Sequence, residues 1–253
     1  MSQFIEACIK ANEEIAVALQ NSFNDIWFEK TEIGAGGDVS SRLDLFAESV
    51  FVKHLSHFGQ IDSEESGLIG EGDVKIIIDP LDGSSNALSL FPYYGTSVAR
   101  VNARGILDTA VVCNLANGDI FVKTVQNKTQ QGKLFSADFQ DPKTLPGSEI
   151  GLFEKAYANS ALIAMMDTEG LKFRAPGAIA LSLAYAQTVN FVLFVGSFRI
   201  YDFAAGLALC EGLEVIVEQD YVIVSKDIDT VKKLEELIRK SRSLEKEEVK
   251  NGI

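Results

Sequence analysis

Residues 60–86 read QIDSEESGLIGEGDVKIIIDPLDGSSN, and this stretch carries most of the information about fold and chemistry. The apolar run KIIIDP at 75–80 is typical of a short buried strand that its proline ends. The Asp82–Gly83 pair that follows predicts a turn. Asp79 and Asp82 therefore stand at the end of a buried strand, where an unpaired carboxylate is unfavourable.

Acidic residues dominate the same stretch. Only Lys75 offsets seven acids between positions 62 and 82, which are Asp62, Glu64, Glu65, Glu71, Asp73, Asp79 and Asp82. Hard oxygen ligands in such a group favour Mg²⁺, Mn²⁺ or Ca²⁺, although D-x-x-D-G alone is also typical of a polar turn. The spacing excludes an EF-hand. A turn would bring both carboxylates and the Leu81 carbonyl together, with Gly83 and Ser84 as anion donors.

A further acid lies far along the chain. Asp202 follows the strand-like SFRIY and precedes the predicted helix DFAAGLALCEG at 202–212. Aspartate in this place is typical of a helix N-cap, which needs no metal. Its alternative role is to join Glu64 and Glu65 around a cation. The residue pattern leaves both interpretations open.

The remaining elements alternate between helical and strand-like patterns. Apolar spacing predicts helices within 1–29 and over 42–57, 177–187 and the charged C-terminal end. Strands are predicted in TSVARV, GILDTAVVCNL and DIFVKTV between 96 and 125, at 191–195, and as a hairpin over 214–225. The glycine-rich 34–37 is predicted to be a loop, and 124–147 an irregular surface excursion. This order predicts a layered α/β fold with an N-terminal half, 1–145, and a C-terminal half, 146–253.

Composition excludes several classes of protein. The chain has 253 residues, 47% of them hydrophobic, and a formal charge of −13 from 36 acids and 23 bases. This charge disfavours nucleic-acid and anionic membrane partners, and no apolar run is long enough to span a bilayer. Three separated cysteines without a C-x-x-C motif predict no disulfide framework. We therefore expect a cytoplasmic protein.

Several segments together resemble the metal-dependent, lithium-sensitive phosphatase superfamily that contains inositol monophosphatase, fructose bisphosphatase and bisphosphate nucleotidase. The family pattern is a Glu-Glu pair, then D-P-[LI]-D-G-[ST]-[ST]-N, then W-D-x-A-A-G, and here these are SEES (63–66), DPLDGSSN (79–86) and YDFAAG (201–206). GGDVSSRLDLFAE (36–48) matches the family's N-terminal loop through Asp38 and Asp44. RAPGAIALSLAYA (174–186) matches its glycine turn and following helix.

The resemblance implies a sandwich of α-β-α-β-α layers and an active site that holds two or three Mg²⁺ ions, with Mn²⁺ as a substitute. The implied metal ligands are Glu64, Glu65, Asp79, the carbonyl of Leu81, Asp82 and Asp202. The implied catalytic residues are Glu64, Asp44 and Ser84, of which Asp44 and Ser84 orient the attacking water. The implied substrate-binding residues are Asp82, Gly83, Ser84, Gly177, Ala178, Arg199 and Asp202.

Two departures concern the substrate. Tyr201 stands where the family commonly has tryptophan, and Val195 where inositol monophosphatases carry a ring-binding glutamate. Arg199, in the same segment, is a candidate ligand for a second phosphate. We expect Mg²⁺-dependent hydrolysis of a small polyol or sugar phosphate by a homodimer. The alternatives are fructose-1,6-bisphosphatase, then bisphosphate nucleotidase, then a non-catalytic relative that binds metal or sugar phosphate.

Overall fold

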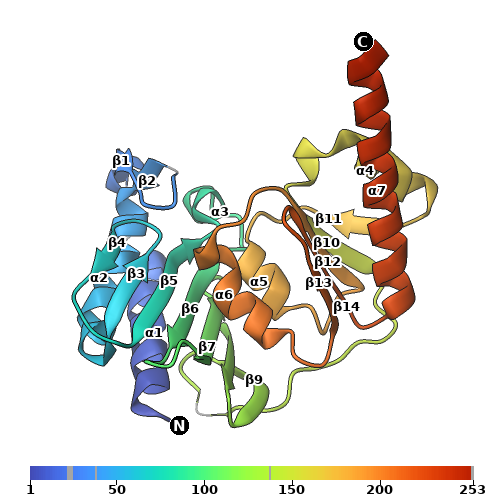
Figure 1. The fold of residues 1–253 in the computed structure, drawn as a ribbon. Helices are drawn as coiled ribbons and strands as arrows, with labels where there is room; N and C mark the ends of the chain where they lie inside the picture. The colour runs from blue at the N-terminus through green and yellow to red at the C-terminus, as the bar shows by residue number, and fades with distance from the viewer. Residues whose placement is uncertain (22–24, 38, 137, 252–253) are drawn as a thin grey trace. The chain divides into compact units, whose positions relative to one another are not determined.

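The computed structural model describes residues 1–21, 25–37, 39–136 and 138–251 (Figure 1). The chain forms two compact units, each of which is discontinuous in sequence. The first contains Met1–Pro142, Ala178–Ala184 and Arg199–Glu211, and the second contains Lys143–Gly177, Tyr185–Phe198 and Gly212–Ile253. The first break lies close to the predicted boundary at 145. The two later returns to the first unit were not anticipated, because they arise from long-range packing.

A seven-stranded, mostly antiparallel sheet forms the centre of the first unit, in the order β4-β3-β5-β6-β7-β8-β9. β3 and β5 are its parallel pair, so the carboxyl ends of these two strands lie at the same edge. The strands are β3 (Gln60–Ser63), β4 (Gly67–Ile69), β5 (Lys75–Asp82), β6 (Gly95–Val101), β7 (Leu107–Asn114), β8 (Asp119–Thr124) and β9 (Asn127–Lys133). A separate two-stranded hairpin consists of β1 (Lys30–Ile33) and β2 (Val39–Ser41).

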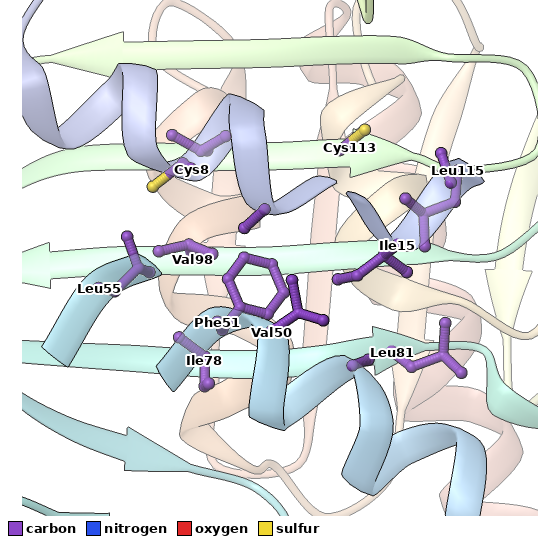
Figure 2. Packing of buried hydrophobic residues seen from close by; sticks show 14 of the residues in the cluster. Cys8, Ile15, Val50, Phe51, Leu55, Ile78, Leu81, Val98, Cys113 and Leu115 are labelled. Carbon is purple, nitrogen blue, oxygen red and sulfur yellow. The ribbon is translucent and has the colours of Figure 1, made fainter. Parts of the chain in front are cut away.

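Helices cover both faces of this sheet. α1 (Gln3–Asn21) and α2 (Arg42–Leu55) enclose a core against one face, and Figure 2 shows Phe51 in its midst. α5 (Ile179–Ala184) and α6 (Ile200–Leu209) contact the central strands β5, β6 and β7. The short helix α3 (Ser84–Leu88) follows β5 directly. The buried cysteines Cys8, Cys113 and Cys210 are free thiols.

Strand alternation decides which face receives the acids. Ile76 and Ile78 of β5 point into the core beneath α1 and α2. Because successive side chains point to opposite faces, Ile77 and Asp79 face the other way. α6 is in contact with β5, so Asp79 projects to the face on which α6 lies.

The second unit has its own sheet and core. Five strands lie in the order β11-β10-β12-β14-β13, with β10 parallel to both of its neighbours. α4 and α7 pack against each other, and their apolar residues join the core of this sheet. The elements are β10 (Ile150–Glu154), α4 (Ser160–Thr168), β11 (Lys172–Arg174), β12 (Phe191–Val195), β13 (Glu214–Val217), β14 (Tyr221–Ser225) and α7 (Ile228–Asn251). In the described part of the chain, short 3-10 helices lie at Asp25–Phe28, Ser56–Phe58 and Ala156–Ala158, the last of them in this unit.

The predicted layered α/β class is confirmed, and most predicted elements are present. Two predictions were wrong, and two strands, β1 and β2, were not predicted. β5 continues through Pro80 to Asp82, because the register shift between Asp79 and Asp82 accommodates a residue without an N–H. β9 lies within the predicted irregular region, where it completes the sheet as an edge strand. The glycine loop 34–37 connects the unpredicted strands β1 and β2.

Among the described residues, no helix is long and apolar enough to cross a membrane.

Candidate metal centre

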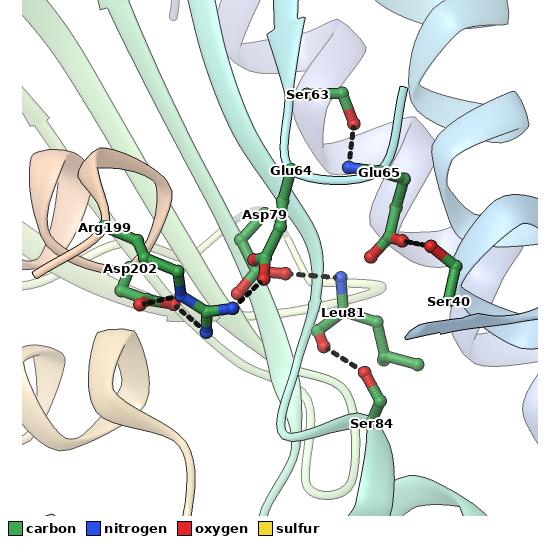
Figure 3. A network of polar contacts seen from close by, with 9 residues as sticks. All are labelled: Ser40, Ser63, Glu64, Glu65, Asp79, Leu81, Ser84, Arg199 and Asp202. Atoms are coloured by element: carbon green, nitrogen blue, oxygen red, sulfur yellow. Dashed lines mark hydrogen bonds and ion pairs between the residues drawn. The ribbon is translucent and has the colours of Figure 1, made fainter. Parts of the chain in front are cut away.

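Three buried carboxylates meet at one edge of the first unit's sheet. Glu64 directly follows β3, Asp79 lies near the end of β5, and Asp202 lies in the first turn of α6. One oxygen from each lies within 4.8 Å of the others, and all three residues are buried. Figure 3 shows the three side chains converging from these separate elements. Asp202, which lies more than a hundred positions after the other two acids in the sequence, is therefore their neighbour in the fold.

Backbone hydrogen bonds hold two of these acids in place. The Glu64 N–H donates to the Ile78 carbonyl at 3.1 Å, which continues the pairing of β3 with β5. The Gly36 N–H donates to the Glu64 carbonyl at 2.7 Å, so the β1–β2 loop lies directly on this acid. The Leu81 N–H donates to Oδ1 of Asp79 at 2.9 Å. This last contact is the turn geometry expected of D-x-x-D, and it occurs together with the acid cluster.

The cluster concentrates negative charge where the carboxylates are buried from solvent. Burial is the main reason why the pKa of Asp79 lies well above its ordinary value. Repulsion from Glu64, Asp82 and Asp202 raises that pKa further, and the hydrogen bond from Leu81 lowers it. One guanidinium opposes this charge: Arg199 forms ion pairs with Glu64 at 2.6 Å and with Asp202 at 2.9 Å.

The DPLDGSS turn lies beside Asp79 and forms part of the site. Gly83 has φ +85°, a left-handed conformation that glycine adopts without strain, and it leads into α3. The Ser84 hydroxyl donates to the Leu81 carbonyl at 2.9 Å (Figure 3). The Ser84 oxygen thereby keeps its capacity to accept a hydrogen bond from water. Asp82 is buried and accepts a hydrogen bond of 3.0 Å from the Leu181 N–H of α5.

A second group of acids lies beside the Glu64–Glu65 turn. Ser40 donates a short hydrogen bond to Glu65. Burial first, and then the charges of Asp44 and Glu48, raise the pKa of Glu65 to about 7, although the Ser40 hydrogen bond lowers it. Asp44 forms a capping box with Ser41 at the start of α2 through its Oδ2. Its other oxygen, Oδ1, is buried and makes no hydrogen bond with any described residue.

The structure brings some of the predicted site residues together and places others elsewhere. It brings Glu64, Asp79 and Asp202 together and places Leu81, Asp82, Gly83 and Ser84 in the turn beside Asp79. Asp202 is not the N-cap of α6, because that helix begins at Ile200 and Arg199 takes the cap position. The N–H of Gly177, in the second unit, donates to Glu154 at 2.9 Å, and Ala178 is buried in the first unit. Asp38 lies outside the described residues.

Three contacts at the site could not be predicted from the sequence. Gly36 lies against Glu64, where an added Cβ would come within 2.5 Å of the Glu64 Cγ. Glu48 accepts hydrogen bonds from both the N–H and the hydroxyl of Ser66, at 3.0 and 2.6 Å. Tyr201 donates to Asp62 at 3.1 Å, so the tyrosine at the family's tryptophan position has a polar role. The sequence signal for these residues is their position within the family motifs at 36–48, 63–66 and 201–206.

The donor set fits a hard divalent cation. Three buried carboxylates supply oxygen ligands from a region small enough for one ion. Asp82, which is also buried, adds to the repulsion that a cation would relieve. Neither cysteine nor histidine belongs to this group among the described residues, so its chemistry favours Mg²⁺ or Mn²⁺ over zinc.

Comparison with solved structures identifies the class of fold to which this structure belongs. The structure of the extragenic suppressor protein suhB from Bartonella henselae superposes with a TM-score of 0.75 over 93% of this chain and 98% of that one, at 21% sequence identity. At this identity, the comparison shows a shared fold, the layered α/β fold of the inositol monophosphatase-like proteins.

Sequence comparison then gives the family. The chain belongs to the inositol monophosphatase family, whose family model matches residues 1–217. A fructose-1,6-bisphosphatase/inositol-1-monophosphatase of Methanothermobacter thermautotrophicus is 30% identical over 72% of this chain and 72% of that protein. The Nus factor SuhB of Vibrio cholerae is 30% identical over 84% and 82%, respectively. A bifunctional NADP phosphatase/NAD kinase of Methanocaldococcus jannaschii is 26% identical over 76% of this chain, which spans only 40% of that relative.

Proposed function

We propose that this protein is a Mg²⁺-dependent phosphatase that hydrolyses a small phosphate monoester with an activated water. The observation that carries the proposal is the convergence of Glu64, Asp79 and Asp202 in a chain of the inositol monophosphatase family. A phosphate ester is an anion, and this acidic site would repel it without an intervening cation. Two or three Mg²⁺ ions, with Mn²⁺ as a substitute, are part of the proposal.

The site residues would have two roles, to bind the cations and to orient the attacking water. Glu64, Glu65, Asp79, Asp82, Asp202 and the Leu81 carbonyl would hold the cations. When bound, such cations supply positive charge to the phosphate and lower the pKa of the attacking water. Asp44 is suited to orient that water because its Oδ1 is buried without a hydrogen-bond partner among the described residues. The Ser84 oxygen would accept a second hydrogen bond from the same water, since its proton is directed to Leu81.

The same motif would bind the ester. The N–H groups of Gly83 and Ser84 are the proposed phosphate donors, because the left-handed turn at Gly83 opens α3 at this point. Gly177 and Ala178 are proposed to contact the substrate, as the family resemblance implies. Val195 borders the apolar core of the second unit. An apolar side chain here disfavours recognition of inositol hydroxyls and favours another polyol or a sugar phosphate.

The nearest alternatives differ in substrate. One relative is named a fructose-1,6-bisphosphatase/inositol-1-monophosphatase, which supports fructose 1,6-bisphosphate as the first alternative. Others are named NADP phosphatases, which adds the 2′-phosphate of NADP to the candidates. A bisphosphate nucleotidase is the next alternative. The fourth alternative is a protein that binds metal or sugar phosphate without hydrolysing it, and we keep it because some relatives carry a name, Nus factor SuhB, that states no phosphatase activity.

A substrate panel tests the proposal. Phosphate release would be measured after EDTA treatment and again after addition of Mg²⁺. The substrates are inositol 1-phosphate, fructose 1,6-bisphosphate, glucose and glycerol phosphates, an adenosine bisphosphate and NADP. We expect turnover of at least one ester only with Mg²⁺, and its loss in Asp202→Asn. Silence across the panel by a protein that still binds Mg²⁺ would favour the non-catalytic alternative.

A further inference from the structure

Arg199 binds two of the three carboxylates, Asp202 through a bidentate contact and Glu64 through a further ion pair. Its Nη1 lies 2.6 Å from Oε1 of Glu64, its Nε 2.9 Å from Oδ2 of Asp202, and its Nη2 3.2 Å from Oδ1 of Asp202. The two acids are well shielded, with exposed fractions of 12% for Glu64 and 7% for Asp202, and the Arg199 side chain is partly exposed at 30%. Shielded charge-assisted pairs with this geometry are the strong kind. Figure 3 shows the guanidinium between the two acids.

These contacts use the oxygens that a cation would need. Both oxygens of Asp202 accept from Arg199, so a cation can bind Asp202 only by sharing an oxygen with the guanidinium or displacing it. The carboxylate of Glu64, which also belongs to the acid group that could hold a metal, forms the ion pair with Nη1 of Arg199. Two positive groups on one carboxylate repel each other strongly where solvent screening is weak.

We propose that Arg199 is an internal competitor of the metal, whose guanidinium must leave at least one of Glu64 and Asp202 before a divalent cation binds there fully. Arg199 thereby sets the cation affinity of the site below the value that its acids alone would give. The coupling is reciprocal, so each bound cation weakens the hold of Arg199 on the acids. This inference rests on the metal assignment made under the proposed function.

Direct cation binding tests the competition. Free Mn²⁺ would be titrated by electron paramagnetic resonance at constant ionic strength against wild type, Arg199→Gln, Arg199→Lys and Arg100→Gln. Arg100 is the matched control, since it pairs with Asp108 at 2.8 Å and has a similar exposed fraction of 28%. Arg100→Gln removes the same charge from the first unit without touching the acid cluster, and its affinity should stay within about twofold.

We expect Arg199→Gln to bind Mn²⁺ at least about tenfold more tightly than wild type. Arg199→Lys should bind severalfold more tightly, because an ammonium cannot bridge both acids as the fork does. The Arg199→Lys variant also tests the inference if Arg199→Gln fails to fold. In EDTA, Arg199→Gln should melt below wild type, and saturating Mn²⁺ should raise its melting temperature more. Adding Asp79→Asn should abolish the gain, which would locate it at this site.

The outcomes separate the two proposals. Unchanged or weaker Mn²⁺ binding by Arg199→Gln, with wild-type binding intact, overturns the inference and leaves the metal assignment standing. In that case, Arg199 organises the acids instead of competing for them. Binding by the variant but not by wild type supports the inference in its strongest form. If neither protein binds Mn²⁺, the metal assignment fails, and the inference fails with it.

Discussion

The N–H of Leu181 donates a hydrogen bond of 3.0 Å to Oδ2 of Asp82, a residue 99 positions earlier in the chain. The contact joins the start of α5 to the end of β5 inside the first unit. Asp82 therefore has two roles that one substitution can separate: its oxygen anchors a helix, and its charge belongs to the acid cluster.

Asp82→Asn tests the charge alone. Asparagine keeps an oxygen that accepts from Leu181, so the fold should survive, and loss of one repelling charge should raise the melting temperature in EDTA. Activity should fall by at least about 10³-fold, because the site loses part of its affinity for cations. Phosphate release and thermal melting give both readouts. Exposed Asp73→Asn is the charge-matched control, and near-normal turnover by Asp82→Asn would contradict the assignment.

Gly36→Ala should damage the site while sparing the fold. The new methyl group would come within 2.5 Å of the Glu64 Cγ and 2.9 Å of its Oε1, so the side chain of Glu64 would have to move. Because only one side chain has to move, the fold should lose little stability, and the melting temperature should change by no more than about 2 °C. We expect about a tenfold or larger loss of Mg²⁺-dependent turnover.

Gly147→Ala is the control for Gly36→Ala, because nothing lies within 4 Å of its added Cβ. The steric argument fails if Gly36→Ala retains full activity, or if its loss of activity follows loss of the fold.

Glu48 is expected to position the Glu64–Glu65 turn from α2. Glu48→Gln keeps one acceptor oxygen for Ser66 and replaces the other with an NH2 group, which can donate but cannot accept. Mg²⁺ affinity should fall by about 10- to 100-fold, the usual effect of losing a group that orients metal ligands. Ser66→Ala removes only the hydroxyl contact and should have a smaller effect. Wild-type Mg²⁺ binding by a folded Glu48→Gln protein would assign Glu48 a role in stability alone.

Glu65 should give stability a measurable pH dependence in EDTA. Its pKa is raised from 4.5 to about 7, mainly by burial. Between these values, the folded carboxyl holds a proton that the unfolded one has lost, so stability is highest below the unfolded pKa and falls as pH rises to about 7.

Glu65→Gln removes this source of pH dependence. Relative to wild type, the variant should gain about 2–4 °C in melting temperature between about pH 5 and about pH 8, or ~1 kcal/mol after allowance for solvent screening. Melting curves across this range provide the measurement. Equal pH slopes for the two proteins would show that the Glu65 carboxyl titrates normally.

The site could be predicted as a set of residues but not as a set of contacts. Asp79 and Asp82 follow an apolar run, so strand periodicity and the burial of charge point to a cation there. Asp202 could not be joined to them from its own surroundings, because N-cap and ligand share the same local pattern. Only the packing of α6 on β5 decides, and that contact depends on the whole sheet.

The predictions that failed were local interpretations overridden by tertiary pairing. A proline usually ends a strand, but the register shift after Asp79 lets β5 pass through Pro80. The polar sequence NKTQQGK has no apolar alternation, yet its backbone pairs with β8 as an edge strand. Arg199 is a different case, because its predicted role as a ligand for a second phosphate stays a prediction. Its contact with Asp202 is local, at i,i+3, whereas its ion pair with Glu64 depends on long-range packing that no local pattern encodes.

The interrupted course of the first unit has a consequence for synthesis. Glu64 and Asp79 leave the ribosome early, whereas Asp202 belongs to Arg199–Glu211, which follows two segments of the second unit. A nascent chain that ends before Arg199 carries the first two acids but neither the third nor the guanidinium that pairs with Glu64. Domains generally fold in the order in which they emerge. Here, the acid cluster can be completed only after most of the chain has been translated, so a loaded centre would mark a nearly finished polypeptide.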